Sequence, residues 1–545
     1  MAENAVVWSY ANAWEPIARL QSDVAAVVQG DRRLTWGEFD AQADALAARL
    51  IAAGLGHNSK VATYLFNCAE YMTTTYAAFK AGMAPFNVNY RYTSDELLYL
   101  FENADAEAVI FHAGFAGRLE EIRARLPLVK VWIAVAEAGH AAPDWAESFE
   151  TIAANAPSER PVKAPWGRSN DDLLILYTGG TTGLPKGVMW RQEDQIGVTG
   201  FGGSPILGVA PLERPEQAAA RIGQFPRRIG LSACPLMHGT GLFSTLMTLL
   251  AGGTVALLAN RHFDAEQLWD TVDRHRVTSI AIVGLPFAQP MLEALERNPG
   301  RWDLSCLSTI GSSGAMWSQE NKRALLKFMP QAMLTDAFSS SEAVGMGLSV
   351  STAAGDSQTA AFLAGPECAV FTEDFKRVAP GSGERGMVAV SAHLPLGYYK
   401  DEAKTNRTFL NIEGKRWSIP GDWATVEADG SLRLLGRGSQ CINTGGEKVF
   451  PEEVEEALKR HPAVRDAAAI GAPDPRFGER ICAVVELQPG ADEPSLGELA
   501  AHVKAHLADY KAPRALVILD SLRRAPNGKL DYKAVKARAL EELGH

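Results

Sequence analysis

Strand-like and helix-like segments alternate along most of the chain, and this alternation limits the possible folds more than any other feature of the sequence. From Leu34 to about Ala113, short β-branched and aromatic runs such as VATYL precede longer helical stretches such as AEYMTTTYAAFKAG. The pattern continues through LLILYT, TSIAIVG, LSTIGSSG and AMLTDAF to about Val350. Strands that alternate with helices form βαβ units, so the sequence predicts an α/β fold with parallel or mixed sheets flanked by helices.

One apolar stretch approaches the length of a membrane span. Gly241 to Ala259 carries no charge, but the Gly252-Gly253 pair divides it into a helix-like half and the strand-like TVALLA. Each half has the length of an ordinary core element. We therefore expect a buried helix, a turn and a strand here, and no membrane span.

The chain is long enough for two domains, because 545 residues exceed the size at which one core keeps growing. Near residue 430 the turn-rich VEADGSLRLLGRGSQ gives way to a compact pattern of helix, strand hairpin, helix, strand and helix. The first of these helices, Pro451 to about Lys459, has proline in its first turn, an acidic start and a basic end. We predict a large domain over residues 1–436 and a small α+β domain over residues 437–545, with the hinge near Gln440, inside the stretch from Gly436 to Gln440.

Composition excludes several classes of protein. The formal net charge of −11 argues against nucleic-acid binding, which needs a basic surface. Six cysteines lie far apart without a CxxC pair, which fits neither a disulfide framework nor a zinc site. The N-terminus, MAENAVVWSYANAWEP, lacks the basic and apolar segments of a signal peptide. We expect a cytoplasmic protein whose mature chain begins at this end.

The segment from Tyr177 to Gly187 directly follows the apolar strand DLLILY and has the composition of a phosphate-binding loop. Glycines let backbone N–H groups approach an anion, threonine hydroxyls add donors, and Lys186 adds a mobile positive charge. A flexible turn is the alternative, but a turn does not require three threonines and a lysine. A Walker A loop is excluded, because Pro185 replaces its second glycine and Gly187 its Ser or Thr. The predicted phosphate ligands are Thr178, Gly179, Gly180, Thr181, Thr182, Gly183 and Lys186.

This segment resembles the signature of the adenylate-forming superfamily, which includes acyl-CoA synthetases, adenylation domains of peptide synthetases and luciferases. At least five further stretches match in the same order, from LTWGEFDAQADALAARL to PNGK, and cover nearly the whole chain. The resemblance implies an acid–thiol ligase that uses ATP and Mg²⁺ to convert a carboxylic acid into acyl-AMP and then into a coenzyme A thioester. It also implies that the large domain includes a β-barrel-like part and that the small domain is mobile.

The stretch from Asp336 to Glu342 resembles the family motif that binds adenine, the α-phosphate and magnesium. It implies that the Phe338 ring stacks on adenine and that the Ser341 hydroxyl contacts the α-phosphate, with Asp336 and Ala337 in the same nucleotide-binding segment. Glu342 and Thr178 are the implied magnesium ligands, since Mg²⁺ prefers oxygen atoms. The family usually has Tyr in place of Phe338 and Gly in place of Ser339, and the second change adds a side chain that would narrow the acyl tunnel.

Three further places resemble nucleotide contacts of the family. Gly314 and Ala315 belong to a glycine-rich loop beside adenine and the acyl group; Ala315 replaces the last glycine of a serine-hydrolase elbow, which disfavours that class. Asp422 and Arg437 resemble the aspartate and the arginine that reach the ribose hydroxyls. Taken alone, Asp422 would more often be a turn former and Arg437 a surface charge.

The residues implied for the chemical steps lie far apart in the sequence. Lys529 in PNGK resembles the catalytic lysine of the small domain, whose ammonium stabilises the charge that develops between the carboxylate and the α-phosphate. Gly445 and Gly446 resemble the segment that forms the pantetheine tunnel after the small domain rotates. His238 resembles a residue that lines this tunnel, although a lone histidine beside apolar residues is usually a satisfied core group. Gln440 stands where the family commonly has Asp or Lys, so no argument from a charged hinge is available.

Loading of a carrier-protein thiol is the main alternative activity, and a pseudoenzyme is disfavoured by the intact set of site residues. The GxGxxG match from Gly381 to Gly386 leads into a strand and not a helix, so dinucleotide binding is rejected. Small or apolar residues in Met237 to Leu242 and Gly311 to Ala315 favour a hydrophobic acid. The chain looks most like bacterial fatty-acid and steroid side-chain CoA ligases. The sequence leaves open which acid is used and the oligomeric state, for which a homodimer is one option.

Overall fold

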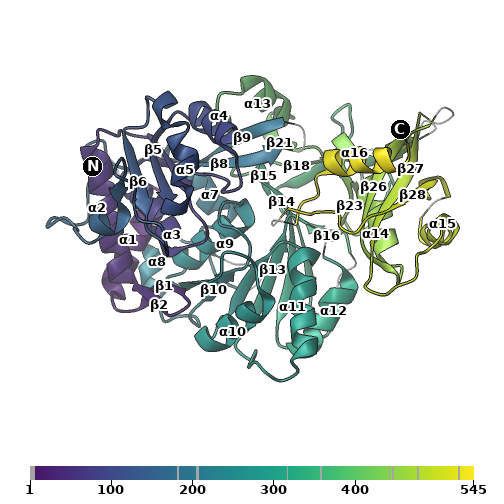
Figure 1. The fold of residues 1–545 in the computed structure, drawn as a ribbon, viewed down its shortest axis with the longest axis horizontal. Helices are drawn as coiled ribbons and strands as arrows, with labels where there is room; N and C mark the ends of the chain where they lie inside the picture. Colours follow the sequence, from purple (N-terminus) through teal and green to yellow (C-terminus); the bar gives the residue numbers. More distant parts are fainter. Residues whose placement is uncertain are drawn as a thin grey trace.

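A computed structural model describes residues 6–180, 183–203, 208–315, 317–355, 359–440, 442–444, 447–474, 478–507, 509–525 and 528–544. These residues form a large N-terminal part that contains two sheets and a small C-terminal part that contains a third (Figure 1). Helices cover the sheets, as the alternating sequence pattern predicts. The small part, green to yellow in Figure 1, lies at one side of the large one.

An eight-stranded sheet carries the predicted phosphate segment. Its strand order is β19-β9-β8-β4-β3-β5-β6-β7. The four central strands β4, β3, β5 and β6 are parallel to one another. The helix α3 (Ala69–Lys80) connects β3 to β4, and α4 (Ser94–Ala104) precedes β5, so the predicted βαβ units are confirmed. The strands are β3 (Lys60–Tyr64), β4 (Ala84–Asn87), β5 (Ala106–His112), β6 (Val131–Val135), β7 (Glu147–Ser148), β8 (Leu173–Gly180), β9 (Gly183–Arg191) and β19 (Gly397–Tyr398).

A fifteen-stranded sheet has a parallel half and an antiparallel half. The parallel half consists of β1 (Ala25–Gln29), β11 (Thr254–Leu257), β10 (Ile229–Ser232), β12 (Ser279–Ile282), β13 (Thr309–Ser313) and β14 (Met333–Ser340). The edge strand β2 (Arg32–Thr35) pairs antiparallel with β1. The antiparallel half consists of β15 (Ala343–Ser351), β16 (Ala361–Ala364), β17 (Cys368–Phe371), β18 (Arg385–Val390), β20 (Phe409–Ile412), β21 (Lys415–Ser418), β22 (Asp422–Val426) and β23 (Leu432–Arg437). The two halves meet at β14 and β15, where the predicted adenine motif lies.

The apolar stretch from Gly241 to Ala259 forms the predicted helix, turn and strand. The helix α9 (Gly239–Leu250) is followed by a turn at Gly252, where φ is +67°, and by β11. Residues of both elements belong to the buried core. In the part of the chain that the structure describes, every helix is too short or too polar to cross a bilayer.

The small domain has the element order that the sequence predicts. The three-residue strands β24 (Ile442–Thr444) and β25 (Glu447–Val449) precede the helix α14 (Pro451–Lys459). The hairpin β26 (Val464–Asp474) and β27 (Gly478–Leu487) follows, and then α15 (Leu496–Lys504), β28 (Ala515–Ile518) and α16 (Tyr532–Glu542). A 3₁₀ turn over Gly438–Gln440 connects β23 to this domain. The structure shows one arrangement of the two domains, so rotation about Gln440 stays a prediction.

Glycines allow the two domains to approach each other closely. Gly436 has a φ of +123°, and a Cβ atom there would lie 2.0 Å from Glu452 Oε2 of α14. The backbone N–H of Arg437 donates to Glu452 Oε1 at 3.3 Å. On the other side, a Cβ atom on Gly528 would lie 3.0 Å from Pro286 Cγ of the large domain. A side chain at position 436 would displace the Glu452 carboxylate, and one at position 528 would press on the backbone and Pro286 of the large domain.

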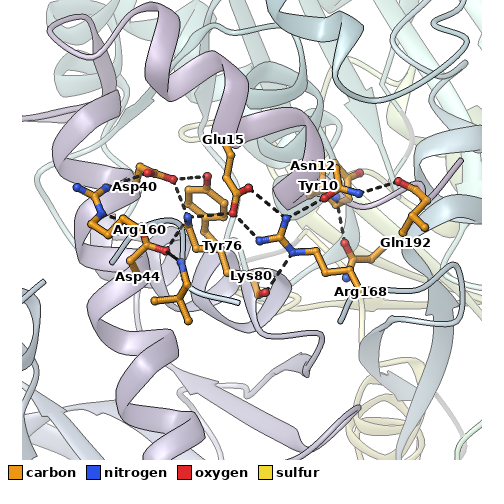
Figure 2. Close-up of polar contacts among 12 residues, drawn as sticks. Tyr10, Asn12, Glu15, Asp40, Asp44, Tyr76, Lys80, Arg160, Arg168 and Gln192 are labelled. Atoms are coloured by element: carbon orange, nitrogen blue, oxygen red, sulfur yellow. Dashed lines mark hydrogen bonds and ion pairs between the residues drawn. The ribbon is translucent and has the colours of Figure 1, made fainter. Parts of the chain in front are cut away.

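A buried ion cluster ties the N-terminal helices together (Figure 2). The ammonium of Lys80, whose side chain is 0% exposed, lies 2.8 Å from carboxylate oxygens of Asp40 and Asp44 and 3.2 Å from Glu15. Arg160 bonds to both aspartates, and Arg168 bonds to Glu15. Three cations thus balance three carboxylates. The cluster joins α1 (Tyr10–Leu20), α2 (Trp36–Ala52) and α3 to the segment that leads into β8.

Candidate active site

The predicted phosphate segment forms a β-hairpin. β8 continues through the glycines to Gly180, and β9 begins at Gly183, with Thr178 paired to Lys186. The sequence suggested a loop directly after the strand DLLILY. In the structure the pairing of β8 with β9 instead continues to Gly180 and Gly183. Thr181 and Thr182 at this tip lie outside the described residues.

Lys186, which the sequence predicts to supply a mobile positive charge, forms an ion pair in the structure. Its ammonium donates to Asp401 Oδ2, while Asp401 Oδ1 accepts the backbone N–H of Lys404 at 2.9 Å. Asp401 is therefore fixed as the cap of the helix α13 (Glu402–Thr408). A lysine ammonium has three donors, so Lys186 can bind a phosphate oxygen without leaving Asp401.

Glu342 lies in the tight turn between β14 and β15. The hydroxyl of Tyr398 donates to Glu342 Oε1 at 2.6 Å, and the hydroxyl of Ser418 donates to the Glu342 carbonyl at 2.7 Å. Burial and the neighbouring carboxylate raise the pKa of Tyr398, so its hydroxyl remains a donor. The other carboxylate oxygen of Glu342 accepts no hydrogen bond recorded for the described residues, which suits a metal ligand.

The neighbouring residues of the adenine motif lie on β14 and in the turn that follows it. The Phe338 ring is 7% exposed and lies 5.4 Å from the Phe362 ring centroid. The Ser339 hydroxyl accepts the backbone N–H of Gly345 at 3.2 Å, which ties this side chain to the β14–β15 hairpin. Ser341 accepts, through its carbonyl, the indole N–H of Trp190 at 3.0 Å.

Asp336 and the glycine-rich loop pack side by side. The Asp336 carboxylate is buried 3.6 Å from the Lys322 ammonium, and burial raises its pKa to about 6. The Ala337 carbonyl accepts the hydroxyl of Ser313 at 2.8 Å. Gly314 has a φ of +97°, a conformation that favours glycine, and Ala315 follows it. These contacts bring the loop after β13 next to the adenine motif on β14.

Asp422 and Arg437 face each other across β22 and β23. Arg437 Nε donates to Asp422 Oδ1 at 3.2 Å. Burial raises the pKa of Asp422, and the charge of Arg437 opposes this shift. Asp422 Oδ2 is buried and has no hydrogen-bond partner in the described part of the chain. A buried oxygen without a donor is costly, and a ribose hydroxyl would supply one.

Lys529 enters this site from the small domain. The preceding Gly528 packs on Val283 and Pro286 of the large domain. Although part of the Lys529 side chain is exposed, protein atoms surround the ammonium and lower its pKa, with Arg437 acting in the same direction. Glu342 and Asp422 raise the pKa of Lys529. The structure thus brings the lysine into electrostatic range of three other predicted site residues.

His238 also lies near Lys529. It caps the start of α9, and burial together with the charges of Lys529 and Arg91 lowers its pKa to about 3. The imidazole is therefore neutral at physiological pH. Thr240 of α9 donates its hydroxyl to the Ser313 carbonyl at 3.3 Å, so His238 and the glycine-rich loop border the same region. Gly445 and Gly446 lie outside the described residues.

The donor set fits the way in which proteins bind magnesium. Across the described residues, no group of three or more His, Cys, Asp and Glu side chains could hold a metal ion alone. Mg²⁺ usually takes one or two protein oxygens together with substrate phosphates and water. Glu342 and Thr178 offer oxygen atoms of this kind, and a magnesium site built on them would need a nucleotide to complete it.

Sequence reasoning missed Tyr398, Asp401 and Lys404, which surround Lys186 and Glu342. These three residues belong to GYYKDEAKT, which reads as an ordinary strand end and helix start. The sequence did contain one signal: Asp401 is a residue that commonly caps the start of a helix, and residues with good helix propensity, such as alanine and lysine, follow it. That signal predicts the helix but not its position beside the phosphate hairpin.

Comparison with known proteins gives a consistent picture. The sequence profile of the AMP-binding enzyme family matches residues 14–399, and that of the AMP-binding enzyme C-terminal domain matches residues 453–529. A medium/long-chain-fatty-acid–CoA/3-oxocholest-4-en-26-oate–CoA ligase of Mycolicibacterium smegmatis is 40% identical over 525 residues, 94% of this chain and 93% of that protein. A 3-oxocholest-4-en-26-oate–CoA ligase of Rhodococcus rhodochrous is also 40% identical, over 94% of this chain and 92% of its own. A solved anthranilate CoA ligase in complex with anthranoyl-AMP has a TM-score of 0.84 at 21% identity, with 99% of each chain covered, which shows the shared fold.

The chain therefore belongs to the family of AMP-binding enzymes, which confirms the resemblance seen in the sequence. Within this family it is an ATP-dependent acyl-CoA synthetase, an acid–thiol ligase that uses ATP, a carboxylic acid and coenzyme A.

Proposed function

We propose that the residues gathered around Lys529 carry out two half-reactions at one site. In the first, the acid carboxylate attacks the α-phosphate, a carboxyl–phosphate bond forms, and the bond to pyrophosphate breaks. In the second, the thiol of coenzyme A attacks the acyl carbon, and AMP leaves with the bonding electron pair. Dividing the reaction through acyl-AMP replaces one difficult substitution with two easier ones.

The observation that carries this proposal is the position of Lys529 among residues of the other domain. Its ammonium lies within electrostatic range of Glu342, Asp422 and Arg437. In the first half-reaction Lys529 would stabilise the negative charge that develops on the α-phosphate and the carboxylate. Asp422 and Arg437 would hold the ribose, and the hairpin of β8 and β9 would hold the phosphates.

A magnesium ion at Glu342 and Thr178 would supply positive charge that neutralises the triphosphate. The protein fixes the metal ligand through Tyr398, which orients the Glu342 carboxylate. Phe338 would stack on adenine, and Ser341 would contact the α-phosphate. His238, neutral and close to Lys529, would line the path of the thiol.

We propose a hydrophobic acid of medium or long chain, or a steroid side-chain acid, as substrate. The relatives at 40% identity are named for such acids. Apolar residues border the region between α9 and the glycine-rich loop: Met237, Leu242 and Val283 are all at most 3% exposed. We further propose that the enzyme works in the cytoplasm and, as a working hypothesis, as a homodimer.

Two assays test these assignments. Lys529→Ala should abolish acyl-AMP formation, measured by pyrophosphate release, but spare thioester formation from supplied acyl-AMP. Equal loss in both half-reactions would show that Lys529 does not have this role. Pyrophosphate release with short, long, aryl and steroid acids, with and without coenzyme A, identifies the acid, and light scattering measures the oligomeric state. Preference for a short or charged acid would contradict the substrate proposal.

A further inference from the structure

A short segment between β18 and β20 contacts Lys186 and Glu342, the two residues predicted to bind the triphosphate and its metal ion. The strand β19 pairs with β9, with Tyr398 opposite Val188, two residues after Lys186. Three residues separate the end of β19 from the start of the helix α13. Gly397, with a φ of +149°, is needed here because a Cβ atom would lie 2.5 Å from Thr405 Cγ2. The segment is therefore anchored to the phosphate hairpin by its backbone and to its own helix by a close contact.

Three side chains of this segment, spaced three residues apart, face the predicted phosphate site. Tyr398 donates to Glu342 at 2.6 Å, and Asp401 accepts from Lys186. Lys404 follows on the next turn, and its ammonium lies 4.2 Å from the centroid of the Tyr398 ring. The ring thus has the metal-ligand candidate at its hydroxyl and a cation over its face.

The Lys404 ammonium has charges of both signs around it. It forms no ion pair with any residue in the described ranges, and the side chain is half-buried. Burial lowers the pKa of Lys404, Glu342 and Asp401 raise it, and the charges of Lys186 and Arg437 lower it. Both of these carboxylates are bonded to other residues, Glu342 to Tyr398 and Asp401 to Lys186, so a ligand that brings negative charge would stabilise this half-buried ammonium.

The surroundings of Lys404 and Lys529 show which part of the nucleotide each would serve. Both ammonium groups interact with Glu342 and Arg437, but Lys529 also interacts with Asp422, a candidate for the ribose. Lys404 instead interacts with Lys186 and Asp401. Lys529 therefore belongs to the ribose and α-phosphate end, and Lys404 to the end where the remaining phosphates would lie.

We propose that Lys404 is a further phosphate-binding residue that, with Lys186, binds the two phosphates that leave as pyrophosphate, while Tyr398 and Asp401 are positioning residues for Glu342 and Lys186. When the bond between the α-phosphorus and its bridging oxygen breaks, the electron pair stays on pyrophosphate. Two ammonium groups beside it stabilise this charge. This inference rests on the phosphate-binding role proposed for Lys186.

Isothermal titration of the full-length enzyme with magnesium pyrophosphate tests the proposal without relying on turnover. Lys404→Ala should weaken pyrophosphate binding about tenfold, the size expected for one charge-assisted contact. Lys404→Arg should restore most of the affinity. Arg407→Ala is the matched control, because it removes an exposed positive charge from the same helix. A thermal melt of each variant shows that it is folded.

Lys186→Ala separates this proposal from the site on which it rests. If Lys186→Ala weakens pyrophosphate binding and Lys404→Ala behaves like Arg407→Ala, the role of Lys404 is wrong while the phosphate site stands. If neither variant loses affinity, the hairpin is not the phosphate site and the proposal fails with it.

Tyr398→Phe tests the positioning role. Removal of one hydroxyl should raise the Mg²⁺ concentration for half-maximal pyrophosphate release about tenfold, the lower end of what loss of a partner of a metal ligand costs. The KM for the acid should stay unchanged. An unchanged Mg²⁺ requirement, or an equal change in the KM for the acid, would contradict the role of Tyr398.

Discussion

Removal of Lys80 should destabilise the large domain strongly, although this residue lies far along the chain from every predicted site residue. Lys80→Met keeps most of the apolar volume but deletes one of the three cations of the buried cluster in Figure 2. Three carboxylates, from Glu15, Asp40 and Asp44, then share the charges of two arginines. Asp44 is the most sensitive of them, since its side chain is 0% exposed and contacts the Lys80 ammonium at 2.8 Å.

The magnitude follows from the remaining contacts. Deleting one partner of a buried ion pair costs about 3–5 kcal/mol. Here Arg160 still bonds to Asp40 and Asp44 at 2.8 Å, and Arg168 still bonds to Glu15. No carboxylate is left without a cation, so we expect the lower end, about 3 kcal/mol. For a cooperative unit of about 430 residues, the size of the large domain, an unfolding entropy of about 2.1 cal/mol/K per residue makes this a decrease of about 3 °C in the melting temperature.

Differential scanning fluorimetry at neutral pH measures this effect. Lys130→Met is the matched control, because Lys130 is also paired with a carboxylate at 2.8 Å but its side chain is 41% exposed. An exposed pair is worth about 0–1 kcal/mol, so the control should lose little. The double variant Lys80→Met/Asp44→Asn restores the balance of charges and should be more stable than the sum of the two single effects predicts.

Equal shifts for Lys80→Met and Lys130→Met would refute this reasoning. So would strict additivity in the double variant, because it would show that the Lys80 ammonium and the Asp44 carboxylate do not interact. Acid should reduce the difference between Lys80→Met and the wild type, because protonation of Glu15 removes a carboxylate charge that Lys80 stabilises. The pKa of Glu15 is lowered: burial opposes this shift, but Arg168 and Lys80 outweigh it.

Three further predictions concern pH. Burial and Arg437 lower the pKa of Lys529, and the cationic form is the active one, so acyl-AMP formation should fall as pH rises through that lowered pKa. Lys529→Arg should move this alkaline limb upward in a pyrophosphate-release assay; an unmoved limb would assign it to another group. Burial and the neighbouring Glu455 raise the pKa of Glu452 from 4.5 to about 8, so its stabilising neutral form is lost as pH rises from about 4.5 to 8. Glu452→Gln should abolish this loss in thermal melts, and parallel pH curves for variant and wild type would count against it. His238, with a pKa of about 3, is neutral throughout, so His238→Asn should slow only the thioester step without changing the pH profile; a lost acidic limb would contradict this.

The sequence predicts those elements whose local signals agree with the fold. α14 has the predicted bounds, Pro451–Lys459, because proline, two glutamates and a basic end all favour a helix at this place. The paired Gly252 and Gly253 predicted the break between α9 and β11 for a similar reason. In both cases the residues that determine the structure are neighbours in the sequence.

Contacts between distant segments gave no such signal. Lys186 and Asp401 are 215 residues apart, and only the pairing of β9 with β19 brings them together. Lys80 reads as the basic end of an ordinary surface helix, yet three acidic residues from two other helices enclose it. Charges at such positions are paired by tertiary packing, which neither propensity nor motif spacing encodes.

The loop that carries Lys529 is held in place by bonds within the small domain. The predicted rotation of this domain is therefore compatible with a precisely placed lysine. Arg524 donates to the Asp466 carboxylate at 2.6 and 2.9 Å and to the Gly528 carbonyl at 3.2 Å, all within the small domain. The backbone of Ala525 closes the turn by donating to the Lys529 carbonyl at 2.9 Å. Contact with the large domain at Gly528 involves only the backbone of that glycine. The described part of the loop is therefore held within its own domain, and Gly528 presents no side chain to Val283 and Pro286, so Lys529 would leave the site with its domain as one body and return to the same position.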